Sequence, residues 1–312
     1  MEDEAGVLNI TPRKYEANPD FQRVRDFLIE TYGITQRPFN WLFDRWDYCR
    51  YFVATMRDRD PRQWEEDIRV WEGDGQLVGV ASHEASRGEV YLQVRPDQRR
   101  LEDEMMAWAE EHLAVETDDG KRRLRVRAYD YDTERQSMLE KRGYRRTDHL
   151  EHRFRRSLEV SLPEPQVPDG YVVRSLREDD DLGARCLALG RAFRDDNPVD
   201  LEVYRSLQSA PGYRLDLDIV IEAPDGSFAA VAIAWYDETN RIGMFEPVGT
   251  VPEHQKKGLG QALMHEGFRR LKDLGATTAY VGAGTQPEAS ALYRSVGFDE
   301  DFTDHAWTKV LN

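Results

Sequence analysis

The chain has 312 residues and a formal net charge of −16, with 40% hydrophobic and 33% charged residues. This length predicts about two domains of ordinary size. The acidic excess disfavours nucleic acid and anionic membranes as partners, because both bind basic surfaces. No apolar run is long enough to predict a membrane span.

Two cysteines, Cys49 and Cys186, are the only ones in the sequence. So few cysteines are typical of a reducing compartment rather than of a disulfide framework. The N-terminus, MEDEAGVLNI, is acidic and lacks an apolar signal segment. We therefore expect a cytoplasmic protein.

In the first half, strand patterns alternate with helix patterns. We expect a hairpin over 67–83 that turns at Gly73–Gly75, a strand at 89–94, a helix at 101–115, a strand at 123–132, a helix at 133–142, and closing strands at 144–150 and 152–158. The aromatic segment 38–52, PFNWLFDRWDYCRYF, is either a helical core or an aromatic surface for an interface or a substrate.

Three prolines within six positions, Pro163, Pro165 and Pro168, mark the clearest boundary of the chain. Such a segment favours an extended linker over a helix or a central strand. We expect a first domain over 1–156, a linker over 157–169 and a second domain over 170–312.

The second half repeats the order of elements of the first. We expect strands at 171–176, 217–222, 227–236, 242–251, 278–284 and 305–311, and helices at 182–193, 259–274 and 287–295. LEKRGY (139–144) aligns with YRSVGF (293–298), and Pro96 aligns with Pro252. The pattern predicts a divergent tandem duplication of α/β domains (α+β with a mixed sheet), in which helices pack on the sheet.

A glycine turn, QKKGLGQ (255–261), stands between an expected strand and an expected helix. Exposed N–H groups and the positive end of a helix bind phosphate, and Gly258 and Gly260 have no Cβ to obstruct it. The spacing is neither that of a nucleotide-triphosphate P-loop nor that of a dinucleotide fingerprint. On its own this pattern could equally be a plain structural turn.

Two motifs together give the turn a specific interpretation. Gln255-Lys256-Lys257-Gly258-Leu259-Gly260 resembles the Gln/Arg-x-x-Gly-x-Gly/Ala loop of the GCN5-related N-acetyltransferase (GNAT) family, and Pro252 precedes it by three residues. The segment 289–298, ASALYRSVGF, resembles the second motif of the family, Ala-x-x-x-Tyr-x-x-x-Gly-Phe. The resemblance covers about residues 170–312. It implies a twisted mixed sheet that opens between its fourth and fifth strands, where Pro247 can be accommodated, and it implies acetyl-CoA as co-substrate.

The resemblance also implies roles for individual residues. The cofactor-binding set would be Val248, Gly249 and Thr250 through their backbone N–H groups, Gln255, Lys256, Lys257, Gly258, Leu259, Gly260 and Gln261 in the loop, and Gln286, where many members carry Asn. Tyr293 would be the general acid, or else a half-buried aromatic residue of a helix face. Glu246 would be the general base, a recognition group for a cationic amine, or a solvent-facing glutamate. We expect Glu246 to share one strand face with Met244, Val248 and Thr250.

The first half lacks these features. Its loop is shorter by two residues, and Glu102, Asp103 and Glu104 place negative charge at the start of the following helix, which repels a pyrophosphate. Leu139 stands in the position of Tyr293. We therefore expect a degenerate GNAT-like domain without a CoA loop. This tandem organisation resembles that of the mycothiol synthases, but other members of the family share it, so it does not identify the acceptor.

The leading hypothesis is an acetyl-CoA-dependent N-acetyltransferase that acts on a small amine by direct attack in a ternary complex, without a metal. The net charge of −11 on residues 157–312 would attract a cationic amine, or would serve solubility alone. One alternative is a noncatalytic acyl-CoA sensor or interaction module. Another is an acetyltransferase of protein N-termini or lysines. The sequence leaves monomer and homodimer open.

Overall fold

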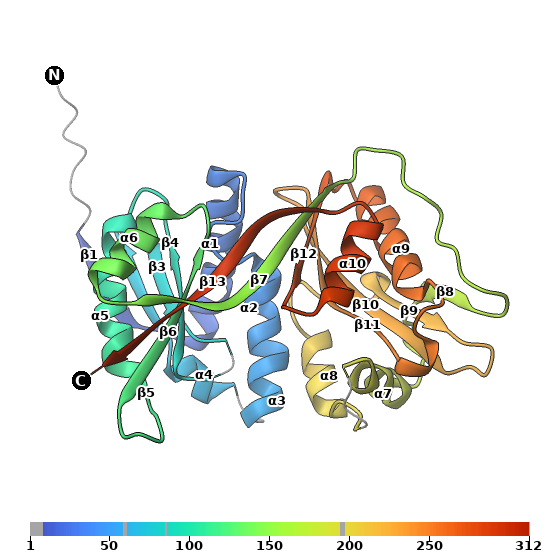
Figure 1. Ribbon diagram of the computed structural model, residues 1–312, viewed down its shortest axis with the longest axis horizontal. Coiled ribbons are helices and arrows are strands. Elements are labelled where there is room, and N and C mark those ends of the chain that lie inside the picture. Colours follow the sequence, from blue (N-terminus) through green and yellow to red (C-terminus); the bar gives the residue numbers. More distant parts are fainter. Residues whose placement is uncertain (1–8, 59–60, 85, 194–196, 312) are drawn as a thin grey trace. The chain divides into compact units, whose positions relative to one another are not determined.

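The computed structural model describes residues 9–58, 61–84, 86–193 and 197–311. It divides into two compact units, Met1–Asp148 with His305–Asn312, and His149–Asp304 (Figure 1). Residues 1–8, on which the expectation about a signal segment depends, lie outside the described part. No helix of the described residues is long and apolar enough to cross a membrane.

The first unit carries helices on a mixed sheet whose strand order is β1-β2-β3-β4-β6 and then β13. Its strands are β1 (Ile10–Lys14), β2 (Arg69–Gly73), β3 (Gln76–Ser82), β4 (Glu89–Val94), β5 (Val115–Glu116) and β6 (Arg122–Tyr129). Its helices are α1 (Ala17–Thr35), α2 (Phe43–Tyr48), α3 (Ala54–Asp58), α4 (Arg62–Glu66), α5 (Glu102–His112) and α6 (Thr133–Lys141), with a π-helical turn at Cys49–Val53.

The second unit has the strand order β7-β12-β11-β10-β9-β8, antiparallel except for the parallel pair of β11 and β12. Its strands are β8 (Val172–Ser175), β9 (Asp218–Glu222), β10 (Phe228–Asp237), β11 (Ile242–Thr250) and β12 (Thr278–Ala283). Its helices are α7 (Leu182–Ala192), α8 (Leu201–Gln208), α9 (Leu259–Asp273) and α10 (Pro287–Ser295). The predicted mixed α/β fold is confirmed in both units.

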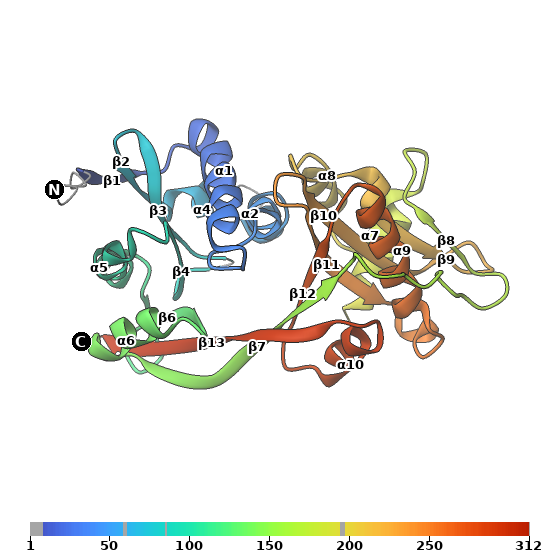
Figure 2. The same cartoon turned by 90° about the horizontal axis from the view of Figure 1, so that it is seen from above.

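Two long strands, β7 (Arg145–Ser157) and β13 (Asp299–Leu311), each contribute to both units (Figure 2). The end of β7 pairs with β12, with Phe154 opposite Val281. Trp307, near the end of β13, is buried in the core of the first unit. The observed division therefore falls at 148/149 and 304/305 and differs from the predicted boundary at 156. The two closing strands predicted at 144–150 and 152–158 are one strand of 13 residues.

Helix α9 packs on one face of the second sheet and α7 on the other. Leu259, Leu263 and Leu271 of α9 are buried at helical spacing. Gly267 of α9 lies directly against the ring of Phe245 in β11. The helix ends as predicted, since Gly275 follows it with φ +102° and the N–H of Ala276 donates to the carbonyl of Leu271.

The aromatic segment 38–52 belongs to the core of the first unit. Trp41 and Trp46 are buried, and they pack in one apolar cluster with Phe21 of α1 and Trp64 of α4. Of the two interpretations open from the sequence, the helical core is confirmed. Helices α1, α3, α4 and α8 were not predicted.

Asp181 caps the N-terminus of α7, where its carboxylate accepts a hydrogen bond of 2.8 Å from the N–H of Gly183. We expect Asp181→Ala to lower the free energy of unfolding by about 1 kcal/mol, the usual cost of a lost N-cap. Urea denaturation of the full chain measures this change. Asp179→Ala is the matched control, because this exposed carboxylate caps no helix. Equal destabilisation by both substitutions would contradict the assignment.

Candidate functional site

The sheet of the second unit opens between β11 and β12. The two strands pair only over Ile242–Phe245 and Thr278–Val281, although β11 continues to Thr250. The edge of β11 beyond Phe245 therefore has no ladder with β12. This is the divergence between fourth and fifth strands that the family resemblance implied.

A β-bulge interrupts β11 where the divergence begins. Ala234 of β10 lies opposite Phe245, but Ala232 lies opposite Val248, so Glu246 and Pro247 together face one residue of β10. Pro247 consequently needs no ladder N–H, as predicted.

The bulge corrects the predicted strand face. Phe245 and Val248 both pack in the cluster with Met264 and Phe268 of α9. Regular alternation would place residues three apart on opposite faces. Met244 therefore faces away from Val248, and the expectation that Met244, Glu246, Val248 and Thr250 share one face is wrong.

The backbone N–H groups of Val248, Gly249 and Thr250 do not all point the same way. The N–H of Val251 donates to the carbonyl of Ala229 in β10 at 2.9 Å. Because N–H groups alternate along a strand, Gly249 also donates toward β10, whereas Val248 and Thr250 point toward the opening. In agreement, the carbonyl of Thr250 accepts a hydrogen bond of 3.1 Å from the side chain of Gln255.

Gly249 is required for packing. A Cβ at this position would lie 2.7 Å from the Cβ of Ala192 at the end of α7. The N–H groups of Val248 and Thr250 thus point away from β10, whereas the N–H of Gly249 points toward it and its Cα packs against the end of α7.

The glycine turn ends at the N-terminus of α9. Gly258 is the N-cap residue and adopts the left-handed conformation with φ +79°. Because glycine has no side chain that could accept a hydrogen bond, the first-turn N–H groups of Leu259, Gly260 and Gln261 have no side-chain cap. A Cβ at Gly260 would lie 3.0 Å from Leu292 of α10, so this glycine lets the two helices approach closely. The arrangement fits a phosphate group.

Side chains around the turn form a short polar chain that the sequence did not reveal. The ammonium of Lys257 lies 3.0 Å from the hydroxyl of Tyr171, which lies 2.9 Å from Nδ1 of His254. Gln261 donates to the hydroxyl of Ser295 at 3.0 Å. Tyr171 was missed, because it lies 86 residues from Lys257 and belongs to the segment before β8.

Three further residues were predicted to bind the cofactor, Lys256, Leu259 and Gln286. Lys256 is exposed with φ +60°, and Leu259 is buried below the turn. Gln286 is the N-cap residue of α10, but its side chain makes no capping hydrogen bond.

Tyr293 of α10 is buried near the opening, 6% exposed. Its ring contacts Phe154 and Phe298 at centroid distances of 5.7 and 6.0 Å. Burial raises the pKa of the phenol, and the negative charge of Glu246 raises it further. The structure therefore brings Tyr293 and Glu246 within electrostatic reach of each other and keeps the phenol protonated at neutral pH.

The corresponding region of the first unit is occupied by an ionic cluster. Glu102 at the start of α5 binds Arg135 of α6 at 3.0 Å and Arg99 at 2.6 Å. Asp132 binds Arg99 at 2.8 Å and caps α6. Leu139, in the position of Tyr293, is fully buried in an apolar cluster.

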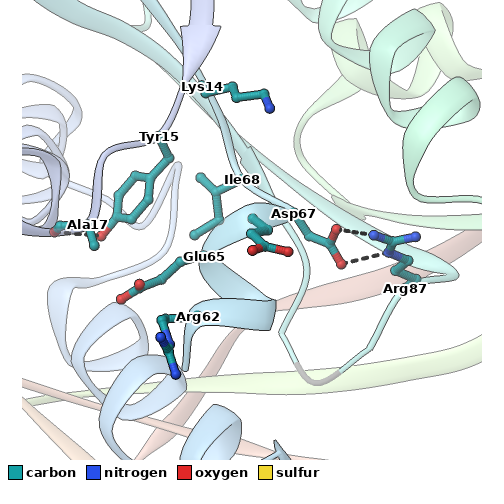
Figure 3. Close-up of a pocket in the computed structure, with 9 residues that line it drawn as sticks. Lys14, Tyr15, Ala17, Arg62, Glu65, Asp67, Ile68 and Arg87 are labelled. Carbon is teal, nitrogen blue, oxygen red and sulfur yellow. Dashed lines mark hydrogen bonds and ion pairs between the residues drawn. The ribbon is translucent and has the colours of Figure 1, made fainter. Parts of the chain in front are cut away.

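The first unit also has a cavity of about 490 Å³ at the start of α1 (Figure 3). Two of the carboxylates that line it already have cationic partners. Asp67 binds Arg87 at 2.5 Å, and Glu65 binds Arg50 at 2.8 Å. Within the described ranges, no group of three or more His, Cys, Asp or Glu side chains could hold a metal ion.

Comparisons with known proteins agree with this geometry. The model of the acetyltransferase (GNAT) domain matches residues 218–300. A mycothiol acetyltransferase from Thermomonospora curvata is 34% identical over 152 residues, 46% of this chain and 50% of that protein, so this chain spans about half the length of that relative. A mycothiol acetyltransferase from Saccharomonospora viridis is 28% identical over 304 residues, 84% of this chain and 94% of that protein.

Among solved structures, a tandem GNAT protein from the clavulanic acid biosynthesis pathway is similar in fold. It has a TM-score of 0.66 at 15% identity, covering 97% of this chain and 98% of that one. Residues 218–300 thus match the acetyltransferase (GNAT) domain model, and the chain as a whole has the fold of a tandem GNAT protein.

Proposed function

We propose that the second unit is an acetyl-CoA-dependent N-acetyltransferase that acts on a small amine. The observation that carries this proposal is that the glycine turn at 255–261, the open edge of β11 and the pair of Tyr293 and Glu246 belong to one unit. Each feature alone has a structural explanation. Together they provide the groups that acyl transfer from a thioester requires.

Acetyl-CoA would enter with its pyrophosphate at the N-terminus of α9. The first-turn N–H groups of Leu259, Gly260 and Gln261 would bind the phosphate oxygens, with Lys257 supplying positive charge. The N–H groups of Val248 and Thr250 would bind along the opening of the sheet. Acetyl-CoA supplies the activated acetyl group.

Three tasks remain for the side chains and the backbone during direct attack by the amine. The N–H groups that point into the opening would stabilise the negative charge that develops on the acetyl oxygen. Tyr293 would donate its proton to the departing thiolate. Glu246 would accept a proton from the amine, or would bind a cationic amine by charge.

The first unit would keep the fold without binding acyl-CoA. The carboxylate of Glu102 stands at the start of α5, where phosphate would have to bind, and it is neutralised by Arg99 and Arg135. No phenol is present in the position of Tyr293. We propose that this unit is a degenerate copy.

Two alternative functions can be distinguished from this proposal by experiment. A noncatalytic acyl-CoA sensor would bind acetyl-CoA without transfer, and an acetyltransferase of proteins would prefer peptides to small amines. A panel of small amines and peptides, beginning with the acceptor of the mycothiol acetyltransferases, separates these functions when release of free CoA is measured. Binding without transfer to any acceptor would favour the sensor.

Glu246→Gln tests the role of the carboxylate once an acceptor is found. The amide keeps the shape and loses the charge and the proton acceptor, so we expect kcat to fall about 100-fold with KM unchanged if Glu246 is the base. If Glu246 recognises a cationic amine, KM for the amine rises instead. Glu238→Gln, at an exposed position of the same unit, is the matched control. Unchanged kcat and KM in Glu246→Gln would exclude both roles.

A further inference from the structure

The segment between β7 and β8, residues 158–171, contacts helix α9 within the second unit. It runs along the outer side of α9 (Figure 1). Lys272 donates to the carbonyl of Val160 at 2.7 Å, and Arg269 lies 3.4 Å from Glu164. The segment therefore passes from the C-terminal end of α9 toward its N-terminal end.

A cavity of about 360 Å³ lies between this segment and the beginning of α9. Pro163, Gln166 and Pro168 line it from the linker, and Lys257, Gly258 and His265 line it from the turn and the helix. Cavities of roughly 300 to 1,000 Å³ hold small ligands. This cavity is therefore large enough to take part of a cofactor.

The cavity begins at the phosphate-binding turn. Lys257 and Gly258 belong to the turn and also line the cavity. A group attached to a phosphate that binds the first-turn N–H groups of α9 would thus enter the cavity directly. Acyl-CoA carries adenosine next to its pyrophosphate.

The chemistry of the walls suits a purine. Proline rings and the methyl group of Ala262 offer apolar contacts, and the amides of Gln166 and Gln261 offer donors and acceptors. Burial and the nearby charge of Arg156 lower the pKa of His265. A neutral imidazole can stack on a base, and such stacking tolerates many ring systems.

The charges of the cavity do not repel the cofactor. Lys257 and Glu164 are the charged residues among those that line it, and Glu164 has Arg269 as a partner. In a protein of net charge −16, this balance permits the approach of an anionic ligand.

We propose that the linker 163–168 and the first turns of α9 form the binding site for the adenosine of acyl-CoA, so that the linker between the two repeats is a functional part of the acyl-CoA site. This inference rests on the proposed function. It assigns His265, Gln166 and the linker prolines a role in cofactor affinity.

The test compares acetyl-CoA with S-acetyl-4′-phosphopantetheine, which lacks the adenosine together with its 3′-phosphate and one phosphate of the pyrophosphate, by calorimetric titration of the full chain. Because loss of base stacking lowers binding free energy, we expect His265→Ala to lower the affinity for acetyl-CoA about tenfold. The same substitution should leave the affinity for S-acetyl-4′-phosphopantetheine unchanged. Gln166 is exposed, so Gln166→Ala should leave the fold unchanged. We expect this substitution to lower the affinity for acetyl-CoA about threefold through the loss of one hydrogen bond.

Pro163→Gly and Pro165→Gly form a matched pair, because Pro163 lines the cavity and Pro165 does not. We expect only Pro163→Gly to lower the affinity for acetyl-CoA selectively. Hydrogen exchange of the linker amides should slow with acetyl-CoA and not with S-acetyl-4′-phosphopantetheine.

The outcomes separate this inference from the proposed function. If the unsubstituted protein binds both ligands equally, or if His265→Ala weakens both ligands by the same factor, the adenosine site is wrong and the proposed function stands. If the unsubstituted protein binds neither ligand, both are wrong.

Discussion

Gly258→Glu is expected to lower the affinity for acetyl-CoA at least 1,000-fold, a loss of roughly 4 kcal/mol. Gly258 has φ +79°, a conformation that costs other residues about 1 to 2 kcal/mol. The new carboxylate would also stand at the N-terminus of α9, where it would compete with the pyrophosphate for the same N–H groups and repel it. Calorimetric titration with acetyl-CoA measures the effect.

Gly226→Glu is the matched control for this substitution. Gly226 has φ +83°, and a Cβ there would meet no atom within 4 Å. Gly226 lies in the hairpin turn between β9 and β10. Gly226→Glu therefore introduces the same backbone strain and the same charge at a site away from the glycine turn. Binding by Gly258→Glu within tenfold of the Gly226→Glu protein would contradict the phosphate site.

Tyr293→Phe is expected to lower kcat about 100- to 10,000-fold, the range that general acid catalysis contributes. The phenyl ring keeps the contacts with Phe154 and Phe298, so binding of acetyl-CoA and stability should change little. Steady-state rates of CoA release and a titration with acetyl-CoA measure the two quantities separately.

The pH profile gives an independent test of Tyr293. Burial and Glu246 raise the pKa of its phenol above the ordinary value near 10, so its deprotonation should not reduce the rate below about pH 10. Tyr236→Phe is the matched control, because this hydroxyl donates to the carbonyl of Leu274 at the other end of α9. Full activity of Tyr293→Phe would exclude Tyr293 as the acid and would leave the acetyl-CoA site intact.

Local patterns in the sequence predicted most of the second unit. The predicted helix at 287–295 coincides with α10, and the predicted helix at 259–274 differs from α9 by one residue. Both helices have a clear start, Pro287 in one and the glycine turn in the other, and a glycine soon after the end. The hairpin of β9 and β10 was recognisable from its Pro-Asp-Gly turn.

Features that depend on pairing between distant segments could not be predicted in this way. The exchange of β7 and β13 between the units depends on which strand each segment meets, and both segments read equally well as strands of their own half. Helix α8 follows a polar segment, and its short apolar pattern at Val203, Tyr204 and Leu207 did not distinguish it.

Within the candidate site, the sequence identified the residues better than their orientation. Family motifs indicated Gly258, Gly260 and Tyr293, but a bulge at Glu246 and Pro247 changed the strand face that simple alternation predicted. Gly249 was assigned to the cofactor through its N–H group, which points toward β10, and its missing side chain makes room for Ala192. Both differences arise from contacts with β10 and α7, which no local pattern records.

The most direct test of an acyl-CoA site confined to the second unit is the number of acetyl-CoA molecules that bind to one chain, measured by calorimetric titration of the unsubstituted protein. We expect one, because the second unit has the open glycine turn and the first unit has the Glu102 cluster at the corresponding helix. Two molecules per chain would contradict the assignment of the first unit as a degenerate copy, and no binding would contradict the proposed function itself.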